Sequence, residues 1–283
     1  TNVIHGASGY DWWIKKYLPT GVEDSSWNKL IGTDGADIPK AVAIDSQDNI
    51  YITGTKSESY FDWWIKKYSS NGTEDATWDK VLDINNFSED NAVSIAIDSE
   101  DSVYVYGDYI DGNKNCMVKK FTSDGTEISS WEKVIDLDGN IVTCQDIAID
   151  SDNHVYITLT YNNGSDTDWW IKKYNSAGTE DANWNKIIDS GNDDILHTLT
   201  FDKNNNVYLA GTANNFLTET SYEDWWLKKF TSAGVEDTSW EKILGDEYAR
   251  DRLFGITIDS QNNIYCVGNN SIGSLWVIKK FIQ

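Results

Sequence analysis

The chain repeats itself at intervals of just over 50 residues, and this periodicity constrains its fold more than any other feature. The segment Asp-Trp-Trp-Ile-Lys-Lys-Tyr at residues 11–17 recurs five more times, in full or weaker form. Its copies start near residues 11, 62, 115, 168, 224 and 275, so the steps are 51, 53, 53, 56 and 51 residues. A regular period of this length is typical of chains built from repeated supersecondary units.

Each repeat contains four short stretches with the composition of β-strands and no helical pattern. The first such stretches are residues 11–17, 27–31, 41–45 and 50–53, which are rich in β-branched and aromatic residues. The polar run at residues 45–49 favours a tight turn. Only 2 prolines are present to interrupt a sheet. Four-stranded units at this period predict an all-β fold, a β-propeller that spans residues 1–283 as a single domain.

The order of these motifs resembles the bacterial SBBP-type β-propeller repeat. The resemblance is carried by Ala-x-Ala-Ile-Asp-Ser at 41–46, Asn-Ile-Tyr-Ile-Thr-Gly at 49–54 and Asp-x-x-Ile-Lys-Lys-Tyr at 62–68, and it recurs over almost the whole chain. The doubled tryptophan before the lysine pair departs from the pattern. The resemblance implies an exported or cell-surface bacterial protein and no single activity. It also places the stretch ending in Ile-Asp innermost. We call the stretches 41–45, 50–53, 62–68 and 78–82 positions A, B, C and D of the repeat.

The number of blades is open between six and five, because B and C occur six times but A and D five times. We favour six blades, since residues 11–17 match position C fully. The six-blade account requires ~25–35 residues before Thr1, the length of one strand pair with its turns. The five-blade account uses residues 27–31 as the closing strand and leaves residues 1–20 over. The mass of the intact mature protein distinguishes the two accounts.

Two spacings within the repeat are constant. Position A ends 6 residues before the tyrosine of B, as in Asp45–Tyr51, and position C begins 16 residues before the tryptophan of D, as in Asp11–Trp27. All length variation therefore lies in the B–C and D–A loops, which emerge on the same side of a propeller. Variation confined to one side predicts that this side carries the function, although loops also tolerate insertion without one.

The charge of the chain is strongly negative, with 46 acidic and 23 basic side chains. The balance argues against nucleic acid as a partner, and no apolar run is long enough to span a membrane. Most lysines fall in positions C and D, which leaves the B–C and D–A loops acidic. We expect a negative face suited to Ca²⁺ or a basic partner. The candidate binding residues are Asp34, Asp37, Glu58, Glu89, Asp90, Asp108, Asp111, Asp166, Asp193, Asp194, Glu219, Glu223, Asp246 and Glu247.

The chain has 14 tryptophans, and most recur at positions C and D. Adjacent residues of a strand face opposite sides, so each tryptophan pair reaches both faces of its sheet. We expect them to pack between neighbouring sheets; the alternative is a set of aromatic platforms for sugar rings. The repeated residues are Trp12, Trp13, Trp27, Trp63, Trp64, Trp78, Trp131, Trp169, Trp170, Trp184, Trp225, Trp226 and Trp240.

Motifs of known enzyme classes are absent from the sequence. It contains no Gly-x-Ser-x-Gly, His-Glu-x-x-His or P-loop pattern, which predicts that the chain is not an enzyme and needs no cofactor. Asp146, His197 and Arg252 break the repeat at or near position A, which the resemblance puts beside the central channel. These three residues keep a Ca²⁺-dependent hydrolase as an alternative.

The leading prediction is a non-enzymatic binding or assembly module, located outside the cell, on its surface or in the periplasm. It would use the variable acidic face to bind a protein or glycan. The alternatives are a lectin, a hydrolase of the central channel, and a structural element that self-assembles through its terminal strands. The sequence names no ligand, partner or oligomeric state.

Overall fold

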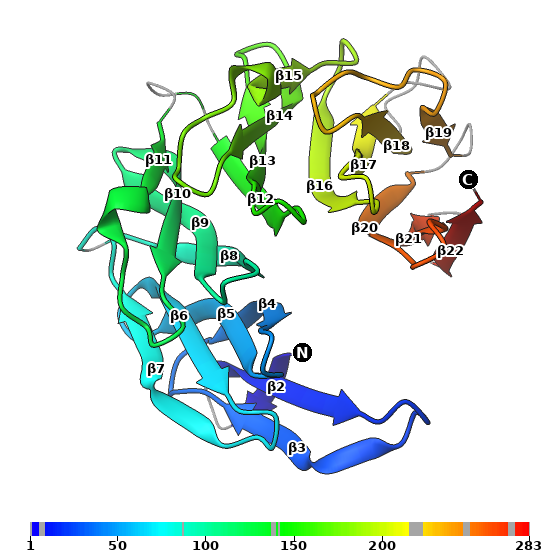
Figure 1. Ribbon diagram of the computed structural model, residues 1–283. Coiled ribbons are helices and arrows are strands. Elements are labelled where there is room, and N and C mark those ends of the chain that lie inside the picture. The colour runs from blue at the N-terminus through cyan, green and yellow to red at the C-terminus, as the bar shows by residue number, and fades with distance from the viewer. Residues whose placement is uncertain are drawn as a thin grey trace. The chain divides into compact units, whose positions relative to one another are not determined.

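The computed structural model describes residues 2–5, 9–86, 88–136, 140, 142–214, 223–245, 250–270 and 275–282. The regular elements in these ranges are β-strands and two short 3-10 helices, and the chain divides into two compact units, Thr1–Gly139 and Asn140–Gln283. Figure 1 shows the strands grouped in separate antiparallel sheets, of which each unit contains three. The all-β prediction is confirmed.

The first unit contains sheets of three, four and four strands. Its first sheet has the order β1 (Asn2–His5), β2 (Gly9–Tyr17), β3 (Glu23–Ile31). The second has the order β4 (Ile38–Ile44), β5 (Ile50–Ser57), β6 (Phe61–Tyr68), β7 (Glu74–Leu82). The third has β8 (Asn91–Ile97), β9 (Val103–Asp111), β10 (Asn113–Phe121), β11 (Lys133–Ile135).

The second unit contains sheets of four, four and three strands. The fourth sheet consists of β12 (Val142–Ile149), β13 (Val155–Asn162), β14 (Thr167–Tyr174), β15 (Lys186–Ile188). The fifth consists of β16 (Asp194–Phe201), β17 (Val207–Asn214), β18 (Glu223–Phe230), β19 (Lys242–Leu244). The sixth consists of β20 (Arg252–Ile258), β21 (Ile264–Asn270), β22 (Leu275–Phe281).

Positions A to D of the repeat become successive strands of each four-stranded sheet, as predicted. The first sheet holds B, C and D, and the sixth holds A, B and C. Residues 9–17 form β2 and pair with β3, so they are part of a sheet rather than left over. The number of blades stays a prediction.

The prediction of no helix is wrong at position D of two sheets. Trp131 and Trp184 end the 3-10 helices η1 (Ser129–Trp131) and η2 (Ala182–Trp184), each of which comes just before a three-residue strand. In η2 the Asp181 carboxylate accepts a hydrogen bond from the Asn183 amide at 3.0 Å, which caps the turn. The outer strand is therefore short here, whereas β3 and β7 have nine residues.

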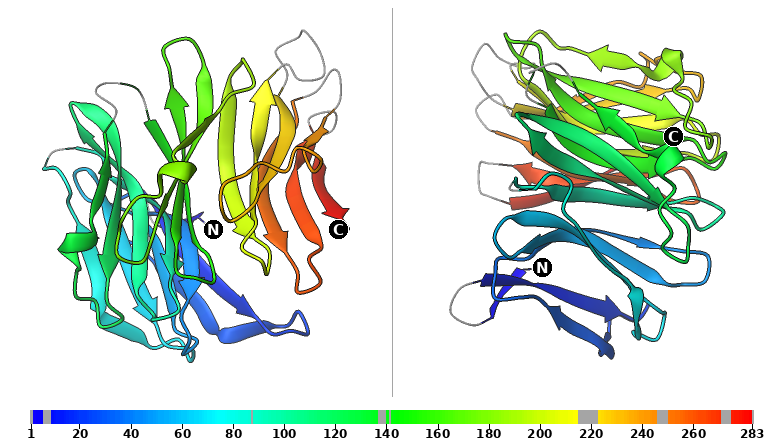
Figure 2. Two further views of the ribbon diagram at one scale, coloured as in Figure 1. Left: turned by 45° about the horizontal axis from the view of Figure 1, so that its top comes forward. Right: turned by 90° about the vertical axis from the view of Figure 1, so that its left-hand side faces the viewer.

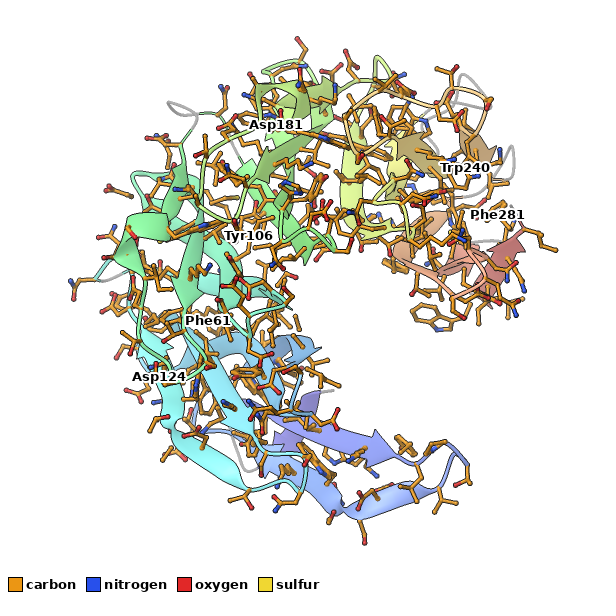
Figure 3. The ribbon with its side chains drawn as sticks, in the orientation of Figure 1. Phe61, Tyr106, Asp124, Asp181, Trp240 and Phe281 are labelled. Carbon is orange, nitrogen blue, oxygen red and sulfur yellow. The ribbon has the colours of Figure 1, made fainter. Side chains whose placement is uncertain are left out.

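The hydrophobic core of each unit lies in the seams between neighbouring sheets, which Figure 2 shows face to face. The repeated tryptophans fill these seams: the Trp12 and Trp64 ring centroids lie 4.7 Å apart, and those of Trp169 and Trp226 lie 4.5 Å apart. Figure 3 labels Trp240 and Phe281, which belong to another seam. Their ring centroids lie 6.3 Å apart. Such contacts between large rings supply most of the burial that holds adjacent sheets together.

The lysine pairs of position C form ion pairs and hydrogen bonds along the strands. The first lysine of a pair forms an ion pair with the following glutamate, as in Lys15–Glu23 at 2.6 Å and Lys172–Glu180 at 2.9 Å. In the first, second and fourth sheets the second lysine reaches the next sheet. The carbonyl of Ser123 accepts hydrogen bonds from Lys67 Nζ at 3.1 Å and from the Trp78 indole at 3.0 Å, and Ser70 and Ser232 have the same role.

Candidate functional site

Carboxylates from three repeat positions meet at the loop end of two seams. They come from the start of position C, from the residue after D, and from the start of A in the next sheet. Asp62, Asp83 and Asp90 form such a group in the first unit, and Asp168, Asp189 and Asp194 form one in the second. Within each group, one ligand atom per residue lies within 4.8 Å of the others. We call these groups the Asp62 cluster and the Asp168 cluster.

Two other seams have glycine in place of the middle aspartate. A Cβ atom on Gly32 would lie 1.9 Å from Asp11 Oδ1, and one on Gly245 would lie 1.9 Å from Asp224 Oδ1. In these seams the position C carboxylate occupies the space over the glycine, and no third carboxylate can stand there without moving it. The seams are therefore of two kinds, one with three acidic positions and one with two.

The position A aspartates hold the D–A loops in place. Asp90 is fully buried and accepts hydrogen bonds from the Ile84 amide at 2.8 Å and the Ser88 hydroxyl at 2.9 Å. Asp194 is fully buried and accepts them from the Ser190 amide at 2.8 Å and the Ser190 hydroxyl at 2.6 Å. These bonds position the carboxylates before any ligand arrives.

Burial and the charges of neighbouring carboxylates raise the pKa of Asp168 and of Asp194. Burial, followed by the neighbouring Asp168 and Asp189 charges, raises the pKa of Asp194 to about 7, against the lowering effect of the Ser190 hydrogen bonds. Burial and then the Asp189 and Asp166 charges raise the pKa of Asp168. The pKa of Asp62 and of Asp90 is also raised, first by burial. Carboxylates in this state favour a bound proton or a bound cation.

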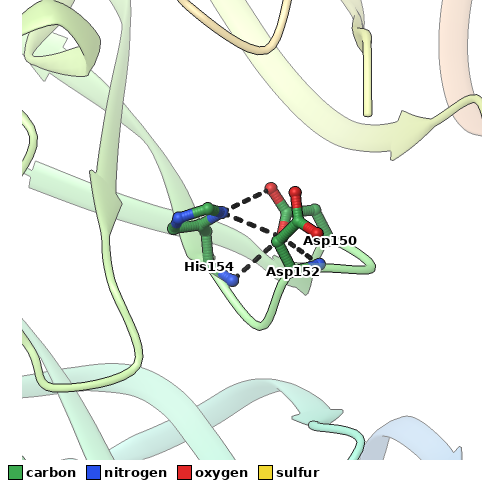
Figure 4. A group of neighbouring side chains, drawn as sticks. All are labelled: Asp150, Asp152 and His154. Carbon is green, nitrogen blue, oxygen red and sulfur yellow. Dashed lines mark hydrogen bonds and ion pairs between the residues drawn. The ribbon is translucent and has the colours of Figure 1, made fainter. Parts of the chain in front are cut away.

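Asp150, Asp152 and His154 form a third group with metal-ligand distances, shown in Figure 4. They lie in the A–B turn, where Asp150 Oδ1 accepts hydrogen bonds from the Asp152 amide at 3.0 Å and the His154 amide at 2.9 Å. The His154 ring lies 3.0 Å from Asp150 Oδ2, the place that the Asn49 side chain takes beside Asp45 in the second sheet. The group is the turn of the repeat with histidine in place of asparagine.

The predicted acidic residues separate into buried and exposed sets. Asp37, Asp90, Asp108 and Asp194 are buried, whereas Asp34, Glu58, Glu89, Asp111 and Asp193 are exposed. Asp166 and Glu223 are half-buried. Glu219, Asp246 and Glu247 lie outside the described residues. Asp62, Asp83, Asp168 and Asp189 were not among the predicted site residues, although the sequence has either Asp or Gly directly after position D in every copy.

Two of the three channel candidates bond to residues outside this set. Asp146 accepts a hydrogen bond at 2.8 Å from the hydroxyl of Thr198, the residue that follows His197. Arg252 pairs with Glu223, its Nη2 atom 3.0 Å from Oε1. Burial lowers the pKa of His197, and the charges of Glu223 and Arg252 act on it in opposite directions. His197 therefore shares its surroundings with this ion pair.

A groove of about 880 Å³ opens in the first unit beside β2 and β4. β1 pairs with residues 9–12 of β2, so among the described residues no strand of the first sheet lies beside the inner edge of Trp13 to Tyr17. Val42 and Ile44 of β4 are 61% and 60% exposed there. In the second sheet, β5 covers the corresponding residues of β6 along their whole length.

The repeated tryptophans offer little surface to a sugar ring. Eleven of the thirteen are buried, and ten of these lie below 5% exposure: Trp12, Trp27, Trp63, Trp64, Trp78, Trp131, Trp169, Trp184, Trp225 and Trp226. Trp170 is 8% exposed. A buried ring cannot stack on a ligand, so these residues do not support the lectin alternative.

Comparison with known proteins identifies the repeat. Residues 27–55 match the family model described as the SBBP β-propeller repeat. Over these residues the chain is similar to that repeat. The matched stretch covers positions D, A and B of the repeat, from Trp27 to Thr55. No curated protein matches this chain in sequence.

Several solved structures share the fold of this chain. The periplasmic gluconolactonase of Pseudomonas aeruginosa matches with a TM-score of 0.60 and 7% identity, over 95% of this chain and 78% of that one. A PL25 ulvan lyase matches with a TM-score of 0.57 and 10% identity, over 90% and 66%. An endo-arabinase of Bacteroides thetaiotaomicron matches with a TM-score of 0.50 and 9% identity, over 87% and 93%. At these identities the likeness is one of fold.

The prediction that the chain is not an enzyme is wrong. It depended on the absence of sequence motifs, and three structures with the same fold are a lactonase, a lyase and an arabinase. Chemistry on a shared fold is set by residues placed at a site rather than by a linear motif. Missing motifs therefore exclude no activity for this chain.

Proposed function

We propose that this chain is a binding module that recruits a positively charged ligand to the B–C and D–A loop ends of its sheets. The observation that carries the proposal is the pair of carboxylate clusters at these ends, one in each unit. In the Asp168 cluster the raised pKa of Asp194 has burial and two neighbouring carboxylates as its causes, and no basic group appears among them. The loop ends are thus a source of negative potential.

The distribution of lysines supports the same proposal. The repeated lysines are committed to ion pairs and ring contacts along position C, as in Lys66 with Glu74 at 2.6 Å and Lys228 with Glu236. Their charge is fixed on the strands, so it does little to offset the carboxylates of the loops. The exposed acids Asp34, Glu89 and Asp111 add to the negative charge of this end.

The proposed location is outside the cytoplasm. Two observations support this location. Residues 27–55 match the SBBP repeat, and resemblance to that family implies an exported bacterial protein. The fold is also similar to that of a periplasmic gluconolactonase. No helix within the described ranges has the length and hydropathy of a membrane span. We propose six blades, one for each sheet, for the same module.

The proposal is tested with a fluorescent octalysine probe by anisotropy at low salt. The loop variant combines Asp34→Asn, Glu89→Gln and Asp111→Asn. Its control, Asp48→Asn, Glu100→Gln and Asp124→Asn, removes the same charge from turns at the opposite ends of the strands. We expect the loop variant to raise Kd about fivefold to tenfold and the control less than about twofold. Equal changes in both variants would contradict the proposal.

A second candidate function is assembly through an exposed strand edge. β22 pairs with β21 on one side, and no described strand pairs with its other side. Trp276 and Ile278 of β22 are 73% and 74% exposed. An open edge with apolar side chains is a template for another strand. Light scattering should show association of the wild type that Ile278→Lys abolishes; a monomer at all concentrations would contradict assembly.

A further inference from the structure

One oxygen of the Asp168 cluster lacks the partner that its burial demands. Asp168 is 2% exposed, and its Oδ1 atom has no hydrogen-bond partner. Its other oxygen accepts a hydrogen bond from Asn163 Nδ2 at 3.0 Å. Leaving a buried carboxylate oxygen without a donor or a cation is unfavourable, because the oxygen has given up water without gaining a partner. The oxygen points to a ligand that completes its surroundings.

The surroundings of the cluster favour a cation over a proton donor from the protein. Asp189 and Asp166 are the charged groups that act most strongly on Asp168, and both are negative. Asp194 uses its two oxygens to accept hydrogen bonds from Ser190, and each oxygen keeps a further lone pair. Asp189 is exposed, so the site opens to solvent on its side.

The Asp62 cluster differs in charge and provides the comparison. Burial and then the Asp83, Asp90 and Glu58 charges raise the pKa of Asp62, and the Lys56 charge opposes them, so the protein balances part of the negative charge there. Asp90 accepts three hydrogen bonds from backbone amides and the Ser88 hydroxyl. We therefore do not propose a cation site at the Asp62 cluster.

We propose that Asp168, Asp189 and Asp194 bind one Ca²⁺ ion at the seam between the fourth and fifth sheets. Three carboxylates supply the hard oxygen ligands that Ca²⁺ prefers, and water on the exposed side completes a coordination number of about 6–8. The ion joins β14 and β15 of one sheet to β16 of the next, so it would fasten the loop ends of both. The inference deepens the proposed function, yet each can fail alone: Ca²⁺ can bind without octalysine, and octalysine without Ca²⁺.

Thermal unfolding in EDTA and in CaCl₂ tests the site. With Ca²⁺ at about 100 times Kd, we expect the Tm of the wild type to rise by about 5–10 °C. Asp168→Asn should lose this rise, and its Tm in EDTA should equal or exceed that of the wild type because repulsion is relieved. Asparagine is compatible with this position, since Asn115 occupies it in the third sheet.

A matched control and a second variant keep the test decisive. Asp62→Asn makes the same change in the Asp62 cluster and should leave the Ca²⁺-dependent rise intact. If Asp168→Asn fails to fold, Asp189→Gly replaces it, because Gly32 and Gly245 occupy that position in other seams. An unchanged Tm of the wild type in Ca²⁺, or an equal rise in the Asp168 or Asp189 variant, would overturn the proposal.

Discussion

At the scale of single residues, aspartates at three recurring positions have different tasks. The aspartate that ends position A closes the A–B turn: Asp150 accepts hydrogen bonds from two backbone amides, and the Tyr156 hydroxyl lies 3.4 Å from its Oδ2 atom. The aspartate that begins position A anchors the preceding D–A loop, as Asp194 does with Ser190. The aspartate of position C faces the seam, where Asp168 has an oxygen left for a ligand.

The turn interpretation of Asp150 and His154 gives a prediction for stability. Asp150→Ala should lower the free energy of unfolding by about 2–4 kcal/mol, because several buried donors lose their acceptor. His154→Asn should change it by less than about 1 kcal/mol, since Asn49 makes the equivalent bond to Asp45 at 2.8 Å. Urea unfolding measures both. A large loss in His154→Asn would show that the histidine does more than close the turn.

The raised pKa of Asp194 predicts how stability depends on pH in the absence of divalent cations. The folded state holds a proton on this carboxyl up to about pH 7, while the unfolded chain releases it near the ordinary aspartate pKa of 3.8. The folded state therefore binds more protons in this window, and stability should fall as the pH rises from about 4 to 7, by up to about 1.4 kcal/mol per unit. Urea unfolding in EDTA at several pH values measures this dependence. The free energy of unfolding should fall less steeply with pH in Asp194→Asn than in the wild type, and an identical fall in both would contradict this account.

At the scale of elements, the seams between sheets are held together by contacts whose partners could not be predicted from the sequence. The strands follow directly from the alternation of apolar residues and from the polar turns. The 3-10 helices before β11 and β15 do not, because Trp131 and Trp184 occur in the same motif as Trp27 and Trp78, which lie in strands. The sequence also showed no sign that Asp37, Asp90 and Asp194 are buried, because their burial depends on hydrogen bonds donated by the backbone amides of loops. Of the site, the sequence indicated the acidic end but not the three positions that meet there.

The hydrogen bond between Trp78 and Ser123 predicts the strength of one seam. Trp78→Phe removes the indole donor to the Ser123 carbonyl and leaves a ring against Tyr51 and Phe121. We expect a loss of about 1–2 kcal/mol in the free energy of unfolding. Trp276→Phe, at a residue that is 73% exposed, serves as the control and should change it by less than about 0.5 kcal/mol. Equal effects of the two substitutions would contradict the importance of this bond.

At the scale of the whole molecule, a formal charge of −23 acts on both units. Net charge of this size works against the compact state through self-repulsion, which salt screens. Without divalent cations, the Tm should therefore rise when NaCl is raised from low to physiological concentration. A fall in Tm would mean that the ion pairs of position C outweigh the repulsion between loop carboxylates.

The account as a whole depends on a cation at the loop end of a seam, and crystallography tests this most directly. Crystals grown in CaCl₂ should show anomalous density at about 2.3–2.6 Å from carboxylate oxygens of Asp168, Asp189 and Asp194. Asp168 Oδ1 should be among the atoms that touch it. A structure from such crystals with no density between these residues, and with Asp168 Oδ1 bonded to a water or to a protein donor, would contradict the account.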